Sequence, residues 1–314
     1  MKRHFISITL ILTVLLFASC KGKEKIADHI ELQQLTLGII PSMDYIPFAV
    51  AQKQGIYDSL GLSVDFVKFQ SASDRDNAFK TGKLDGAITD LTHAIFLQAN
   101  GAGLKIIMKT DGALYLLTGK ESGIRKLSDL KLTNIGVSEN TAAEFFTDIT
   151  LQSANILTEN VNKPKINKIP VRLEMLQNGQ IDASFFPEPF ATVARNNGMK
   201  TLITSKELGI NVSGTIFSEK AIQEKSEEIT ALVQGYNLGV EFIKTHPAKE
   251  WIKILAEDSE LPESAVKHVH STDFQKAELP EAKDLKANIS WLKAKQLIKN
   301  NFTGENLVDS TFVK

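Results

Sequence analysis

Hydroxyl and carboxylate side chains directly follow five predicted strands, in loops at residues 42–45, 71–74, 90–93, 138–141 and 186–188. In an open, mainly parallel sheet, ligands bind outside the carboxyl ends of the strands, where the next helices also expose free N–H groups. The same side chains can cap those helices, a role that suits Ser71 and Ser73 better than binding. The candidate ligand-binding residues are Ser42, Asp44, Tyr45, Asp90, Thr92, Ser138, Thr141, Phe186 and Glu188.

Motifs for catalysis or for metal and cofactor binding are missing from the sequence. There is no G-x-S-x-G nucleophile elbow and no H-E-x-x-H zinc helix. His268 and His270 have no further histidine near them in sequence and are interpreted as surface residues, and Gly101-Ala102-Gly103 lacks the third glycine of a dinucleotide loop. The single cysteine, Cys20, excludes an intramolecular disulfide and a cysteine metal cluster. We therefore expect no catalytic residue, no metal and no cofactor.

The charge of the five loops indicates the charge of the ligand. Their acidic residues outnumber the basic or titratable ones at their edges, Arg75 and His93; the acids are Asp44, Asp74, Asp90, Glu139 and Glu188. Carboxylates repel an anion, so this pattern favours a flat ring with amino donors, such as an aminopyrimidine, stacked on Tyr45 and Phe186. The alternative is that most of these acids cap helices and that Arg75 holds an anion.

Strand-like and helix-like segments alternate from Leu35 onward, and the alternation restarts near Ile135. This order predicts an α/β fold in which mainly parallel sheets are flanked by helices. A short internal repeat indicates that the chain has two halves of similar topology. Residues 79–87 and 176–184 share a helix end, a glycine, an apolar residue, an aspartate and a buried strand. After residue 218 the pattern is chiefly helical.

The N-terminus predicts export and anchoring. Lys2 and Arg3 precede an apolar run from Phe5 to Ala18, which suits a signal peptide and is too short for a membrane-spanning helix. The run ends in Phe17-Ala18-Ser19-Cys20, which is similar to a bacterial lipobox with phenylalanine in place of the usual leucine. We expect a signal peptide over residues 1–19, lipidation of Cys20 and a tether over 20–34. With a formal net charge of −1 and no basic patch, nucleic acid is not an expected partner.

Several segments, in order, resemble a family of importer-associated solute-binding proteins. The segment 47–57 with 61–64 resembles its "P-x-x-V-A-x-x-x-G-x-[FY]…G-L-x-V" opening, 82–87 its "G-x-x-D-x-A" element, and Glu188-Pro189 its "E-P". Residues 127–137 resemble "L-x-D-L-x-G-K-x-I-G-V", with Leu132-Thr133-Asn134 where the family has Gly-Lys. The resemblance covers roughly residues 35–249. The subgroup binds aliphatic sulfonates, nitrate, taurine and thiamine pyrimidine precursors.

The resemblance implies a two-lobed periplasmic-binding-protein-like fold with the ligand in a cleft between the lobes. Lobe one would comprise residues 35–118 and 213–314, and lobe two residues 119–212. The implied protein is a monomeric ABC-importer component that closes by a hinge and delivers its ligand to permease subunits. It would be lipid-anchored in the cell envelope and face the periplasm or exterior. A pyrimidine-forming enzyme on this fold uses a cysteine-rich motif that this chain lacks, so no enzymatic activity is expected; a sensor module is a further alternative.

Overall fold

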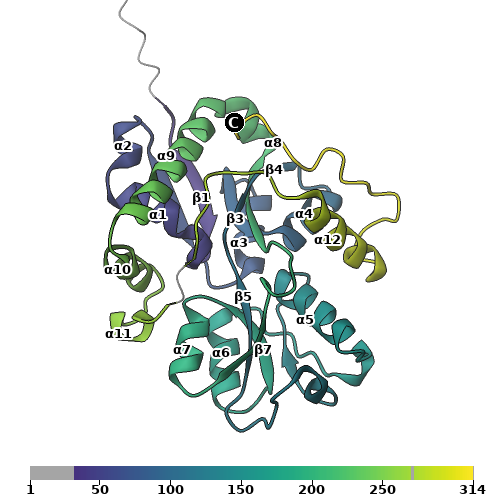
Figure 1. Cartoon of the computed structure of the whole chain (residues 1–314). Helices are drawn as coiled ribbons and strands as arrows, with labels where there is room; N and C mark the ends of the chain where they lie inside the picture. The colour runs from purple at the N-terminus through teal and green to yellow at the C-terminus, as the bar shows by residue number, and fades with distance from the viewer. Residues whose placement is uncertain (1–31, 270–271, 314) are drawn as a thin grey trace, which may run out of the picture. The chain divides into compact units, whose positions relative to one another are not determined.

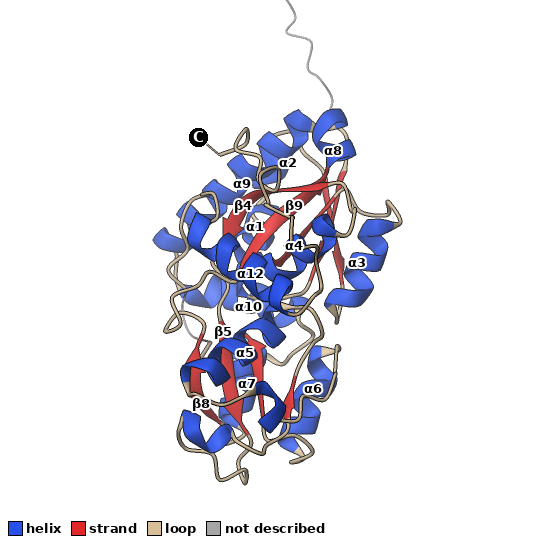
Figure 2. Cartoon of the chain, turned by 90° about the vertical axis from the view of Figure 1, so that its right-hand side faces the viewer, coloured by secondary structure: helices blue, strands red, loops and turns tan. Residues whose placement is uncertain are grey.

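The computed structural model describes residues 32–269 and 272–313, which contain two β-sheets with helices packed on both (Figures 1 and 2). The predicted signal peptide, lipidation site and most of the tether lie outside the described residues. Among the described residues, no helix is both long enough and apolar enough to cross a membrane.

The first sheet has the strand order β2-β1-β3-β9-β4. Strands β1, β2 and β3 run parallel, whereas β9 pairs antiparallel with both β3 and β4. A single reversed strand, β9, therefore lies within an otherwise parallel sheet. The strands are β1 (Leu35–Ile39), β2 (Val64–Lys68), β3 (Gly86–Asp90), β4 (Leu104–Thr110) and β9 (Ser213–Ser218).

The second sheet repeats this design with four strands in the order β6-β7-β5-β8. Strands β6 and β7 are parallel, and β5 runs antiparallel to both β7 and β8. The reversed strand of each sheet is thus the one that the chain enters after crossing from the other sheet. The strands are β5 (Leu114–Thr118), β6 (Ile135–Gly136), β7 (Ala183–Pro187) and β8 (Lys200–Thr204). The predicted α/β class with mainly parallel sheets is confirmed.

The crossings between the sheets are short. The chain leaves β4 at Thr110 and enters β5 at Leu114, and it returns between Thr204 of β8 and Ser213 of β9. Residues 114–118, which the sequence places in the first lobe, instead pair with β7 and β8 of the second sheet. An apolar strand does not reveal its pairing partner from sequence, because the partner is about seventy residues away.

Most helices follow strands and begin at recognisable N-terminal signals. Ser71, Asp90 and Thr141 cap α3, α4 and α5 with side-chain oxygens. Proline stands in the first turn of α1 and of α6, where the missing N–H costs nothing. The helices up to β8 are α1 (Ile46–Lys53), α2 (Ile56–Ser59), α3 (Ala72–Lys80), α4 (Leu91–Ala99), α5 (Ala142–Ser153), α6 (Ile169–Gln177) and α7 (Phe190–Asn196).

The C-terminal helices pack mainly on the first sheet. The long helix α9 lies against α1 and buries Ile229, Leu232 and Tyr236 in the largest core cluster. The helices are α8 (Glu219–Glu224), α9 (Ser226–Thr245), α10 (Ala248–Asp258), α11 (Glu263–Val266) and α12 (Ala282–Ala294).

Helix α12 contacts helices that belong to both sheets. It packs on α4 (Figure 1), where Thr92 donates a hydrogen bond to the Asn288 side chain. On its other side the Trp291 ring meets the Phe145 ring of α5 edge-on, with centroids 5.7 Å apart. The Trp291 Nε1 also donates to Asp148 Oδ2 at 3.0 Å. Helix α12 therefore connects the two halves in addition to the two crossings.

Candidate functional site

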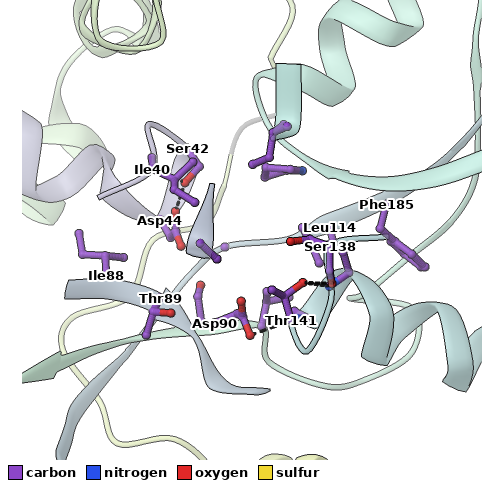
Figure 3. Close-up of a pocket in the computed structure, with 18 of the residues that line it drawn as sticks. Ile40, Ser42, Asp44, Ile88, Thr89, Asp90, Leu114, Ser138, Thr141 and Phe185 are labelled. Atoms are coloured by element: carbon purple, nitrogen blue, oxygen red, sulfur yellow. Dashed lines mark hydrogen bonds between the residues drawn. The ribbon is translucent and has the colours of Figure 1, made fainter. Parts of the chain in front are cut away.

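A cavity of about 100 Å³ lies between the two sheets and is lined by residues from both (Figure 3). It is surrounded by the carboxyl ends of β1, β3 and β7 and by the first turns of α3, α5 and α6. This is the position that the sequence predicted, because strand ends and helix N-termini meet there. Five of the nine candidate residues line it: Ser42, Asp44, Asp90, Ser138 and Thr141.

Ser42 and Asp44 reach the cavity from the short 3₁₀ helix η1 (Met43–Tyr45), which follows β1. The Ser42 hydroxyl contacts the Asp44 carboxylate and also donates to the Ile40 carbonyl at 2.8 Å. Burial raises the pKa of Asp44, although hydrogen bonds from Ser42 and Ser213 and the charge of Arg75 act in the opposite direction. A raised pKa means that this carboxyl group holds its proton more tightly than an exposed aspartate does.

Asp90 ends β3 and links the two halves. Its Oδ1 accepts hydrogen bonds from the backbone N–H of His93 at 2.8 Å and from that of Ala142, at the start of α5, at 3.0 Å. Burial raises the pKa of Asp90, and its interactions with His93 and Arg75 offset this only in part. The carboxylate therefore acts as a cap for two helices as well as a wall of the cavity.

Ser138 and Thr141 form the facing wall, in the loop between β6 and α5. The Thr141 hydroxyl donates to the Ser138 carbonyl at 2.8 Å and accepts from the Ala143 N–H at 3.2 Å. The Ser138 hydroxyl lies 3.5 Å from Asn167 Oδ1, and Asn167 also lines the cavity. Both hydroxyls thus sit beside the N-terminus of α5, as expected from their sequence position.

Two of the predicted ligand-binding residues, Tyr45 and Thr92, do not line this cavity. Tyr45 is only 2 % exposed and packs into the core against Phe66, with ring centroids 5.2 Å apart. Thr92 is buried under α12, where it bonds Asn288. Tyr45 stands one position after Asp44 and Thr92 two positions after Asp90, and the turn of the helix carries both side chains away from the wall that Asp44 and Asp90 line.

The two predicted residues at the end of β7, Phe186 and Glu188, do not line this cavity either. Successive side chains of a strand point to opposite faces, so Phe185 lines the cavity and Phe186 is buried behind it. Glu188 is 2 % exposed; it accepts from the Thr192 N–H at 2.9 Å and pairs with Arg195. Its carboxylate is satisfied within α7 and is not directed to this cavity.

Two buried arginines line the cavity. Arg75, which the sequence analysis placed at a loop edge, donates from Nε to Asp76 Oδ1 at 3.0 Å and from Nη1 to the Ile88 carbonyl at 3.0 Å. Burial disfavours the charged form of Asp76, but the adjacent Arg75 guanidinium and His93 outweigh this and lower the pKa of Asp76. Arg75 therefore has its own counter-ion.

Arg172 was missed by the sequence analysis because it lies in the first half of a helix, outside the five loops. It is 2 % exposed and donates to Ser184 Oγ at 3.0 Å and to the Ile166 carbonyl at 2.6 Å. Its guanidinium carbon lies 5.3 Å from the centre of the Phe186 ring. Burial lowers the pKa of Arg172 to about 10, so the group still carries its charge at neutral pH. Gly112 and Ser213, at the two crossings, also line the cavity and were not predicted.

The sequence profile of the NMT1-like family matches residues 28–256. The chain belongs to the NMT1-like family. An aliphatic sulfonates-binding protein of Bacillus subtilis (strain 168) is 24 % identical over 325 residues, which cover 98 % of this chain and 95 % of that protein. The predicted resemblance to solute-binding proteins is confirmed at the level of family and fold.

Solved structures of similar fold include both binding proteins and an enzyme. The ligand-binding component of an ABC-type import system from Staphylococcus aureus, solved with zinc bound, has a TM-score of 0.77 and 15 % identity, covering 89 % of this chain and 97 % of that one. The desulfurization enzyme DSZB has a TM-score of 0.66 and 15 % identity, with 89 % and 97 % coverage. Across residues 32–269 and 272–313, no cluster of three or more His, Cys, Asp or Glu side chains could hold a metal ion.

Proposed function

We propose that this NMT1-like protein is the solute-binding component of an ABC importer and that it captures a small solute in the cavity between its two sheets. The observation that carries this proposal is that both sheets contribute walls to one cavity at their strand ends. A solute there would contact both halves at once, which is what capture by closure requires. The similarity to import-system binding proteins supports the same function.

We further propose that the two sheets, with their helices, are two lobes that move as rigid bodies about the crossings at 111–113 and 205–212. A ligand shifts such an equilibrium only by binding the closed form more tightly than the open form. Small-angle scattering of the full-length protein should therefore show a smaller radius of gyration when a bound solute is present. An unchanged radius, with chemical cross-linking showing the apo protein still open, would contradict this motion.

Two classes of ligand are consistent with the walls of the cavity. An aminopyrimidine would donate to the carboxyl groups of Asp44 and Asp90, as the sequence analysis predicted. An anion such as a sulfonate would instead use Arg75, Arg172 and the helix N-termini. Two observations favour an anionic ligand. Asp74, Glu139 and Glu188 do not line the cavity, and burial raises the pKa of Asp44 and of Asp90.

The experiment that tests the function is a thermal-shift screen of the full-length protein against alkanesulfonates, nitrate, aromatic carboxylates and aminopyrimidines, followed by titration calorimetry of each hit. Binding with a dissociation constant in the micromolar range or tighter supports solute capture. Because ligands that bind only the folded state raise its apparent stability, true binding must also move the melting temperature with ligand concentration. The absence of binding across all four classes would refute the proposal.

Anchoring at Cys20 is proposed from the sequence alone. The lipobox-like Phe17-Ala18-Ser19-Cys20 and the polar stretch after it fit a lipid-anchored protein in the cell envelope, facing the periplasm or exterior and delivering its solute to permease subunits. Cell fractionation should find the wild type with membranes and the Cys20→Ser variant in the soluble envelope fraction. A wild type that is already soluble would contradict anchoring.

We propose no enzymatic activity. Because the desulfurization enzyme shares the fold, the fold does not separate binding from catalysis, and the distinction rests on the site. The residues that line the cavity include no cysteine and no histidine, so a thiol nucleophile and an imidazole base are missing from its walls. Recovery of an unchanged ligand after prolonged incubation with the protein would agree with this; turnover would not.

A further inference from the structure

The two arginines of the cavity occupy equivalent positions in an internal repeat. Helix α6 and strand β7 lie 97 residues after helix α3 and strand β3, with the same lengths, and Arg172 lies 97 residues after Arg75. Each arginine donates to the carbonyl of the residue 13 positions further on, Ile88 or Phe185, at 3.0 and 3.5 Å. The repeat therefore places one guanidinium from each sheet at the same cavity.

The stems of these arginines are positioned alike as well. A Cβ atom added at Gly38 of β1 would stand 2.8 Å from the Arg75 Cγ, and one added at Gly136 of β6 would stand 3.3 Å from the Arg172 Cγ. Each arginine thus crosses a glycine of the neighbouring strand, which leaves room for its side chain. The equivalence therefore extends to the path of the two side-chain stems and is not only a match of sequence spacing.

The two positions differ at residue 89, whose hydroxyl accepts from Arg75 where Phe186 lies beside Arg172, and in the residue that follows the arginine. Asp76 follows Arg75 and pairs with it, with Nη2 3.0 Å from Oδ1. The equivalent residue after Arg172 is Leu173. Among the described residues no carboxylate lies within 4 Å of the Arg172 guanidinium, and its hydrogen-bond acceptors, one hydroxyl and two carbonyls, are all neutral.

A buried charge without a counter-ion is costly, and proteins rarely keep one without a use. Arginine has five N–H donors, of which three have acceptors here, so two are available to a partner. Arg172 also lines the cavity. A negatively charged ligand would supply to Arg172 the counter-charge that Asp76 supplies to Arg75.

Resting on the proposed solute-capture function, we propose that Arg172 binds the anionic group of the ligand, a sulfonate or a carboxylate, and sets the preference of the site for negative charge. Arg75, already neutralised by Asp76, has the lesser part in that charge selection. The repeat thus yields one arginine paired within the protein and one paired by the solute.

The first test needs no mutation. Calorimetric titration of the full-length protein with methanesulfonate, butanesulfonate, benzoate and nitrate is compared with titration with the neutral isostere methanesulfonamide. We expect at least one anion to bind, and the sulfonates to bind at least about 30-fold more tightly than the sulfonamide, because an unpaired buried charge rejects a neutral partner. Equal affinity for methanesulfonate and methanesulfonamide would overturn the inference.

The second test changes the charge at position 172. Arg172→Gln should weaken anion binding at least about 30-fold, whereas Arg172→Lys, which keeps the charge, should lose less than about 10-fold. A purely structural role would not distinguish the two, since both shorten the side chain. The control is Arg195→Gln, an arginine that pairs with Glu188 and does not line the cavity; it should leave anion affinity unchanged. Equal losses for Gln and Lys would overturn the inference.

A third variant gives the arginine of the second repeat the neighbouring carboxylate that the arginine of the first repeat has. Leu173→Asp places a carboxylate beside Arg172, at the position equivalent to Asp76, and should abolish anion binding while circular dichroism shows a folded protein. If the wild type binds only neutral or cationic solutes, the inference fails and solute capture stands. If the wild type binds no solute of any class, solute capture and the inference fail together.

Discussion

The Asp90 carboxylate accepts a hydrogen bond from the Ala142 N–H at 3.0 Å and thereby joins the end of β3 in the first sheet to the start of α5 in the second half. The same oxygen accepts from the His93 N–H, so one side chain caps two helices. His93 reinforces the connection, because its Nδ1 lies 3.0 Å from the Asn140 carbonyl just before α5. Asp90, which forms part of the cavity wall, therefore also joins the two halves of the protein.

Replacing Asp90 by alanine should destabilise the protein by about 2 kcal/mol, because two helix N-termini lose their acceptor. Urea denaturation measures the free energy of unfolding. The matched control is Asp74→Ala, whose carboxylate accepts from the Ser71 hydroxyl within a single helix and should cost less than about 1 kcal/mol. Equal losses for the two variants would show that the contact with α5 contributes nothing.

Asp44 should make stability fall as the pH rises. Burial raises the pKa of this carboxyl group in the folded protein above its value in the unfolded chain, about 4. The contribution of Asp44 to the free energy of unfolding is therefore full below the unfolded pKa and is lost as the pH rises through the raised folded pKa. Asp44→Asn, which stays neutral, should gain up to about 1 kcal/mol relative to wild type at pH 7 and none at pH 3. The exposed Asp65→Asn is the control, and urea unfolding across that pH range decides. A constant difference between variant and wild type would contradict the prediction.

Glu188 should prove to be a structural residue. Glu188→Gln removes the charge that pairs with Arg195 and should lower the free energy of unfolding by about 2 kcal/mol. Its effect on the affinity for any solute found in the screen should stay within about 2-fold, because the carboxylate does not line the cavity. Calorimetry and denaturation on the same preparation separate the two effects, and a large affinity loss with unchanged stability would place Glu188 at the ligand.

The ionic contact between α12 and α5 should confer sensitivity to acid. Burial opposes the ionisation of Glu144, but hydrogen bonds from Lys295 Nζ at 2.8 Å and the Asn140 N–H outweigh it and lower the pKa of Glu144. The stabilisation that this ionised carboxylate provides is present above its unfolded pKa of about 4.3 and is lost as the pH falls through the lower folded pKa.

Lys295→Met should therefore cost about 1 kcal/mol at pH 7 and progressively less below pH 4. Lys253→Met is the control, because Lys253 pairs with Glu257 on an exposed helix surface and should cost less than about 0.5 kcal/mol. Denaturation curves at pH 7 and pH 3 give the comparison. A cost that does not shrink in acid would mean that Lys295 stabilises α12 through packing alone.

Gly112 should be sensitive to the addition of a single methyl group. A Cβ atom there would stand 2.6 Å from Ser213 Oγ and 3.2 Å from the Asp44 Cβ, both on the cavity wall. We expect Gly112→Ala to weaken solute binding by about 10-fold, because groups that must align with a ligand would shift. In the control Gly103→Ala the nearest atom is the flexible end of Glu219, away from the cavity. Equal affinities for both variants would contradict this.

Much of the site was predictable because it depends on local rules. Ser42, Asp90 and Thr141 follow strands and precede helices, and that position alone brings them to the edge where strand ends meet. Tyr45 and Phe186 do not line the cavity, for a local reason of a different kind. Each stands one residue from a side chain that does line the wall, and the sequence does not reveal which of two neighbours faces inward when both are apolar or both follow a strand.

The sequence by itself determined the alternation of strands and helices and the repeat that relates the two halves, because these follow from hydrophobic periodicity, caps and glycines along neighbouring residues. The class of protein followed from the resemblance of several segments, in order, to a known family. Only the tertiary structure decided the pairing of β5 with β7, the burial of Glu188 beside Arg195 and the lack of a counter-ion at Arg172 within the described part of the chain. Those features depend on which residues distant in sequence come within a few ångströms of one another. A charge is paired or unpaired only in that three-dimensional arrangement.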